Sequence, residues 1–260
     1  MIAVWSPDAP GAIAELPLSA RPSAGPEGAL ALLSGGDGWP ERACAAIDAG
    51  ARAVAVADPG GAGLDRLDAL AAAADAAGVA VLVHRRAAAL LHAHGDRDDL
   101  RAPVAIVLEC AAGEAALPAA LRDALGLARE LGSARELERR LAGARSVFAA
   151  VAGPTGSASV VADRITGSAP ALLRATVLGR SARLELELDD AAATTRVLVA
   201  TEAGASHAPR DLEDPARRVL RLALATLGEP GARGAAAAEG DHGLAALRRD
   251  TELAHAVLHG

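Results

Sequence analysis

The sequence contains no lysine, asparagine, glutamine or tyrosine, and only three aromatic residues. Without lysine the chain can form no Schiff base and has no lysine general acid. Without tyrosine, every reductase mechanism that depends on a tyrosine is excluded. The formal net charge is −7, and arginine carries all of the basic side-chain charge apart from histidine. We therefore expect no nucleic-acid partner.

Cysteine is also scarce. Cys44 and Cys110 lie in apolar patterns without CxxC spacing, so we expect two reduced core residues, no metal site and a cytoplasmic location. The segment Met1–Trp5 has neither a basic region nor a long apolar run, so we expect no signal peptide. No stretch reaches the roughly 18 apolar residues of a membrane span, so we expect no membrane association.

What the chain does contain is an alternation of apolar runs and helical patterns between residues 29 and 86. Apolar runs at Ala29–Leu33, Ala53–Ala57 and Val79–Val83 are separated by helical patterns at Pro40–Ala49 and Leu64–Ala77. Glycines stand at the turns between them. This strand–helix–strand–helix–strand order predicts a parallel sheet with helices packed on it.

The second half of the chain shows a different pattern, with short apolar runs separated by turn residues. Ala182–Leu188 alternates charged and leucine residues, as expected of a strand with one face in water. The five predicted strands are Ser146–Val151, Ser157–Ile165, Ala171–Leu178, Ala182–Leu188 and Thr194–Thr201. Runs of strands after a βα block indicate an α+β second domain.

The remaining elements complete the predicted architecture. Ile2–Trp5 is predicted as an edge strand and Arg135–Leu141 as the continuation of a helix, and two helices close the chain at Asp214–Leu227 and His242–Leu258. The predicted fold class is α/β. A truncated Rossmann-like parallel βαβ block (1–101) is followed by an α+β domain with an open, mostly antiparallel sheet (102–260).

This layout resembles the Gfo/Idh/MocA family of NAD(P)-dependent sugar oxidoreductases. Leu32–Pro59 is similar to the family segment that ends in Glu-Lys-Pro, and Leu67–Val83 with His84-Arg85-Arg86 is similar to the helix and strand that follow it. Ala120–Gly132 resembles the helix that carries the family's active-site Asp and His. The resemblance implies a Rossmann domain, an NAD(P) cofactor, and an open sheet through which copies or relatives assemble into homo-oligomers or hetero-oligomers.

The chain departs from the family at the residues that carry its chemistry. Asp58 stands where the family has its catalytic lysine, and Trp39 stands where it has a histidine. The family's second-domain Asp-x-x-x-His pair falls at Ala119 and Asp123. Only 28 residues precede Ala29, fewer than the family's first βαβ unit requires. These departures predict a truncated and degenerate member, and no catalytic residue is assigned.

A second alignment of the same residues suggests a dinucleotide fingerprint. Gly36 and Gly38 lie between a strand and a helix, and Asp58 ends the next strand about 20 residues on. Glycines there let backbone amides approach a pyrophosphate, and the carboxylate binds a ribose. Glu41 opposes this interpretation, because it replaces the third glycine and repels phosphate. The alternative is a structural turn in which Pro40 opens the helix.

The residues after the third predicted strand are candidates for substrate binding. His84, Arg85 and Arg86 end a strand, where α/β proteins place ligands, and they suit a sugar acid or a phosphate. The alternative is a solvated strand exit.

Two functions remain open from the sequence. One is a degenerate Gfo/Idh/MocA-like protein that acts as a non-catalytic partner or small-ligand binder. The other is an active NAD(P)-dependent oxidoreductase on a sugar or related polyol, which uses Gly36, Gly38 and Asp58 for the cofactor. A barrel-like enzyme is disfavoured by the strands after Ser146.

Overall fold

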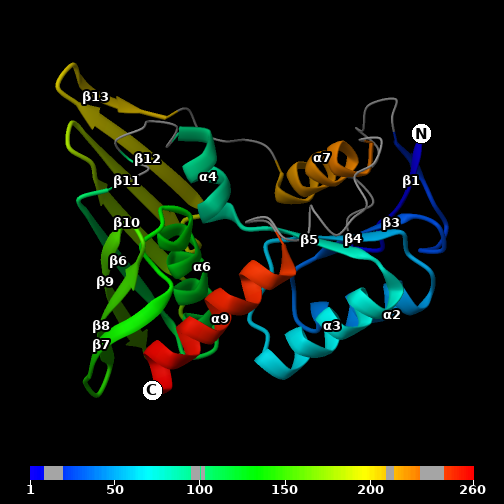
Figure 1. The fold of residues 1–260 in the computed structure, drawn as a ribbon, viewed down its shortest axis with the longest axis horizontal. Helices are drawn as coiled ribbons and strands as arrows, with labels where there is room; N and C mark the ends of the chain where they lie inside the picture. Colours follow the sequence, from blue (N-terminus) through cyan, green and yellow to red (C-terminus); the bar gives the residue numbers. More distant parts are fainter. Residues whose placement is uncertain (9–19, 95–99, 101–102, 209–213, 229–242) are drawn as a thin grey trace. The chain divides into compact units, whose positions relative to one another are not determined.

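A computed structural model describes residues 1–8, 20–94, 100, 103–208, 214–228 and 243–260. The chain forms two compact units. The first consists of residues 1–86 with 212–249, and the second of residues 87–211 with 250–260. Figure 1 shows the elements of both units in sequence colours.

A five-stranded parallel sheet forms the centre of the first unit, with the order β2-β1-β3-β4-β5. Its strands are β1 (Ile2–Trp5), β2 (Ala20–Pro22), β3 (Leu30–Ser34), β4 (Ala53–Ala57) and β5 (Ala80–His84). Every residue of β4 and β5 is buried, as expected of parallel strands covered on both faces. The predicted βαβαβ block is confirmed.

Helices cover both faces of this sheet (Figure 1). Helices α2 (Trp39–Asp48) and α3 (Leu64–Ala77) pack on one face, over a core that includes Leu33, Val54 and Val81. Helix α7 (Pro215–Gly228) packs on the other face, against β3, β4 and β5. The unit is therefore a three-layer α/β/α sandwich with all five carboxyl ends of the strands at one edge.

An eight-stranded mixed sheet forms the second unit, with the order β13-β12-β11-β10-β6-β9-β8-β7. Its strands are β6 (Ala105–Gly113), β7 (Glu136–Ala142), β8 (Ser146–Gly153), β9 (Gly156–Ile165), β10 (Leu172–Leu178), β11 (Ala182–Asp189), β12 (Thr194–Thr201) and β13 (Gly204–His207). Among the described strands of this second sheet, only β6 and β9 pair in parallel, and all other neighbours are antiparallel. The predicted mostly antiparallel sheet is confirmed.

One face of the eight-stranded sheet forms the core of the second unit. Helix α6 (Leu117–Glu130) packs on it, with side chains of α4 (Arg86–His94) and of the second half of α9 (Leu244–His259) in the same core. Cys110 is buried in this core, whereas Cys44 of the first unit is only half-buried. The other face carries exposed apolar side chains, including Val107 and Phe148. The expected assembly through this sheet stays a prediction.

Two elements differ from the sequence-based expectation. The segment predicted to continue a helix over Arg135–Leu141 is strand β7, which pairs with β8 in antiparallel register. Its exposed arginines and glutamates are typical of an edge strand. The segment Ile2–Trp5 is not an edge strand, because β2 adds beyond it. Pairing partners distant in the sequence decided both outcomes, and local pattern does not contain them.

The predicted linear division at 101/102 falls at residues outside the described part of the chain. The compact units are interleaved rather than consecutive, because α7 and the first half of α9 pack with the N-terminal sheet. None of the helices described is long and apolar enough to cross a membrane.

Candidate functional site

The carboxyl ends of β3, β4 and β5 bring three sequence segments to one edge of the parallel sheet. Ser34 is paired with Ala57, and Ala57 with His84, so the residues that follow these positions lie side by side. Open α/β sheets bind ligands at this edge, in the crevice where the strand order reverses. Here the order reverses between β1 and β3. The point of reversal is therefore flanked by the residues that follow Trp5 and Ser34.

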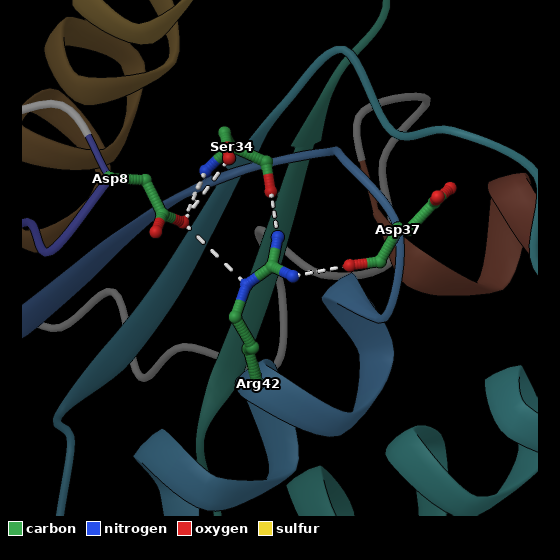
Figure 2. Close-up of polar contacts among 4 residues, drawn as sticks. All are labelled: Asp8, Ser34, Asp37 and Arg42. Atoms are coloured by element: carbon green, nitrogen blue, oxygen red, sulfur yellow. Dashed lines mark hydrogen bonds and ion pairs between the residues drawn. The ribbon is translucent and has the colours of Figure 1, made fainter.

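A polar cluster occupies this point of reversal (Figure 2). One carboxylate oxygen of Asp8, Oδ2, lies 3.3 Å from the backbone nitrogen of Ser34, 3.2 Å from its hydroxyl and 3.6 Å from Nε of Arg42. The guanidinium of Arg42 also donates to the carbonyl oxygens of Ser34 and Asp37. An amide, a hydroxyl and a guanidinium therefore converge on one negatively charged oxygen, which is the donor set of an anion site.

The glycines after β3 have separable roles. A Cβ on Gly35 would lie 2.1 Å from the carbonyl oxygen of Asp58, so this glycine permits close contact with the loop after β4. Gly38 has φ +70° and caps the start of α2 in the left-handed region that favours glycine. A Cβ on Gly36 would meet no atom within 4 Å. Only Gly36 thus borders open space at the proposed cofactor loop.

Asp58 lies at the end of β4 and faces the end of β5. Its Oδ1 is 3.7 Å from Nδ1 of His84, and its Oδ2 is 3.4 Å from Nη2 of Arg86. The backbone of Asp58 has φ +45°, a region that few non-glycine residues adopt and that recurs at functional sites. In the dinucleotide-fingerprint interpretation, this carboxylate binds the ribose of a cofactor held at the loop after β3. Its two partners instead come from β5 and from the first residue of α4, which follows β5.

His84 is the most unusual polar group at this edge. The residue is 3% exposed, and neither ring nitrogen has a hydrogen-bond partner within the described parts of the chain. A buried polar group without a hydrogen bond costs about 1–3 kcal/mol. Arg85 is equally buried, whereas the side chain of Arg86 is 39% exposed. Of the three residues predicted to bind substrate, His84, Arg85 and Arg86, Arg86 is therefore the one with a substantially exposed side chain.

Other positions aligned with the family's chemistry do not form a site. Trp39, at the position of the family's histidine, is fully buried in the core beneath α2. In the second unit, Asp123 is bound by the adjacent Arg122, whose Nη2 lies 2.8 Å from its Oδ1. Ala119 carries no polar group. In the described residues, the charged groups at the parallel-sheet edge remain the better candidates.

Sequence reasoning missed Asp8, Ser34 and Arg42 as site residues. The sequence pattern predicts Ile2–Trp5 as an edge strand, which would place the following loop away from the point of reversal. Its interior position puts Asp8 beside Ser34. The signal available was the short interval between an apolar strand and a lone carboxylate, at the place where α/β folds hold ligands.

The architectures of the two units identify the fold. A parallel α/β unit is combined with an open, mostly antiparallel sheet backed by helices, and this is the fold of the Gfo/Idh/MocA-type oxidoreductases. The expectation of this fold is confirmed. No protein-family model matches the sequence, and no curated protein matches it.

Solved structures of this fold cover nearly the whole chain at low sequence identity. A proposed NADPH-dependent oxidoreductase from Desulfitobacterium hafniense matches with a TM-score of 0.68 at 14% identity, over 99% of this chain and 94% of its own. KijD10, a 3-ketoreductase from Actinomadura kijaniata in complex with NADP, matches at 0.61 and 12%, over 100% and 97%. UDP-N-acetylglucosamine 3-dehydrogenase GnnA from Acidithiobacillus ferrooxidans matches at 0.59 and 15%, over 99% and 88%.

Proposed function

We propose that this protein is an NAD(P)-dependent oxidoreductase that acts on a sugar or a related polyol. The observation that carries the proposal is the convergence of charged groups at the carboxyl edge of the parallel sheet, in a fold shared with a UDP-N-acetylglucosamine 3-dehydrogenase and a 3-ketoreductase. The KijD10 complex with NADP and the proposed NADPH-dependent oxidoreductase from Desulfitobacterium hafniense support the cofactor class. The alternative, ligand binding without turnover, is an outcome of the experiment below.

The donor set at the point of strand reversal fits an anionic part of the cofactor. Asp8 places a carboxylate oxygen against Ser34 and Arg42, where a phosphate oxygen would find the same three donors. The open space over Gly36 leaves room for a ligand beside them. Asp8 therefore acts as a stand-in for the anion, and it must turn away for a phosphate to bind.

The work of this chain's residues follows from that placement. Ser34 and Arg42 bind and orient the anion, and the buried strands exclude water from the floor of the site. The nicotinamide, when bound, accepts or supplies the hydride. Asp58 follows β4, the strand next to β3, and lies within reach of a substrate held beside the cofactor because neighbouring strands lie about 4.8 Å apart.

Arg42→Ala is expected to weaken NADPH binding by about tenfold or more, because it removes a charge-assisted contact worth about 1.5–3 kcal/mol. Asp8→Asn is expected to strengthen binding, because it removes a negative charge that competes for the same donors. The measurement is isothermal calorimetry with NADH and NADPH, supported by the fluorescence of Trp5 and Trp39. Arg52→Ala, at the opposite edge of the sheet, is the matched control and should leave affinity unchanged.

Turnover is tested next, with a panel of nucleotide sugars, free sugars and polyols. Reduction of NAD(P)⁺ by any of them supports the oxidoreductase. Binding of NAD(P)H without turnover across the panel favours the non-catalytic ligand binder. If neither cofactor binds at millimolar concentration, or if Arg42→Ala binds as well as the unaltered protein, the proposal is wrong.

A further inference from the structure

We infer that Asp58 and His84 form the acid–base pair of this oxidoreductase, at the position where the resembling family has a lysine. The inference rests on the proposed function, and it assigns the proton-handling groups that sequence comparison left unassigned. It stands on two independent observations. One is the geometry that joins the ends of β4 and β5, and the other is the buried imidazole of His84, to which the described residues offer no hydrogen bond.

The depth of the two side chains sets the order in which a proton passes. The side chain of Asp58 is 30% exposed, whereas that of His84 is 4% exposed. Asp58 is therefore the group that touches a substrate hydroxyl, and His84 lies behind it. The 3.7 Å between Oδ1 and Nδ1 is longer than a hydrogen bond, but catalytic contacts commonly tighten only when the substrate is bound.

The positive-φ backbone of Asp58 and the contact with Arg86 hold the carboxylate in this place. With its backbone in the left-handed region, Asp58 projects its side chain in a direction that the extended strand conformation would not allow. Arg86 contacts Oδ2 and leaves Oδ1 facing His84. Arg86 is thus a positioning residue, and the oxygen nearest the imidazole is the one available for proton transfer.

The reaction balances with these groups. In alcohol oxidation, the carbinol C–H bond breaks and its electron pair leaves as hydride to the oxidised nicotinamide. The O–H proton passes to the carboxylate of Asp58, and the C–O bond becomes a carbonyl. Nδ1 of His84 then takes the proton from Asp58, which regenerates the carboxylate. Reduction of a ketone follows the same path in reverse. The substrate class is therefore an alcohol and the corresponding carbonyl compound.

The first test reads the pair without turnover. Long-range proton–nitrogen NMR spectra report the two imidazole nitrogens of His84, assigned by comparison with His84→Gln. We expect Asp58→Asn to shift the Nδ1 resonance clearly at a fixed pH, because a neutral amide replaces the carboxylate beside it. Asp75→Asn, an exposed carboxylate at the far end of α3, should leave it in place. An unchanged Nδ1 resonance in Asp58→Asn overturns the pair.

The second test measures kcat and cofactor affinity separately. We expect Asp58→Asn to lower kcat by about 10²–10⁴-fold while the NADPH dissociation constant changes less than threefold. His84→Gln should lower kcat by about tenfold or more and alter the pH profile, with KM nearly unchanged. Asp58→Asn keeps the assay decisive if His84→Gln does not fold, because asparagine tolerates the left-handed backbone.

The outcomes separate the two proposals. An unaltered protein that binds no cofactor, yet shows the Nδ1 shift in Asp58→Asn, refutes the oxidoreductase and retains the coupled pair. Normal turnover by the Asp58→Asn variant refutes the acid–base pair but is consistent with the oxidoreductase.

Discussion

Gly35→Ala is expected to destabilise the first unit by about 3 kcal/mol or more, one of the largest effects of any single methyl group in this chain. The added Cβ would lie 2.1 Å from the carbonyl oxygen of Asp58 and 2.3 Å from Cα of Pro59. Both are backbone atoms, so no side-chain rotation can relieve the contact. The two loops are also joined by a hydrogen bond from the amide of Gly60 to the carbonyl of Gly35. The loop after β4 must therefore shift.

Urea denaturation followed by circular dichroism measures this loss. Gly36→Ala is the matched control, because the same methyl group one residue later would meet open space at a backbone φ that carries no glycine-specific strain. We expect it to change the free energy of unfolding by less than about 1 kcal/mol. Equal stability of Gly35→Ala and Gly36→Ala would contradict the close approach of the two loops.

The shift expected in Gly35→Ala also bears on function. Asp58 belongs to the loop that the methyl group would push, so the contacts of its carboxylate with His84 and Arg86 should be lost together with the packing. Under conditions in which circular dichroism shows Gly35→Ala to be folded, we expect its turnover to be reduced, as in Asp58→Asn.

Asp250→Ala is expected to destabilise the second unit by about 3–5 kcal/mol. Oδ1 of Asp250 lies 2.8 Å from Nε of Arg129, and the two side chains are 2% and 10% exposed. Removing one partner of a buried ion pair leaves the other charge desolvated and less well compensated, which costs far more than the net value of the pair. Chemical denaturation of the full chain measures the effect.

The neighbouring pair on the same helix supplies the control. Arg248 binds Asp68 in the first unit, where both side chains are more than 40% exposed. Exposed ion pairs contribute about 1 kcal/mol at most, so Asp68→Ala should be nearly neutral. If Asp68→Ala and Asp250→Ala destabilise equally, burial is not what sets the strength of the Arg129–Asp250 pair.

Local pattern was sufficient for the first half of the fold and for most of the second. The continuous apolar runs of β3, β4 and β5 predicted buried parallel strands, because only strands covered on both faces lack alternation. The alternation of β11 predicted a half-exposed antiparallel strand, and its leucines are indeed buried. The helix predicted over Arg135–Leu141 was wrong because the charged residues there suit either an exposed helix or an edge strand. The pairing with β8 makes the segment a strand.

The candidate site was predictable in part. Asp58 and His84 could be placed at the ends of neighbouring strands, because parallel strands end at one edge. Their chemical relation could not be foreseen, because it depends on a positive φ at Asp58 and on the depth of His84. The contacts of Asp8 could not be predicted from the sequence, because they depend on β1 lying between β2 and β3.

The lack of lysine and tyrosine excludes the reactions that need them, and hydrophobic periodicity indicates which segments form strands and helices. These are properties of composition and of residues close together in the chain. Three features instead depend on the folded molecule: which strand lies at the sheet edge, that α7 returns to cover the first sheet, and that Asp58 faces His84. Each of these depends on contacts between residues far apart in the sequence, whose pairing is set by the burial of whole faces rather than by local preference.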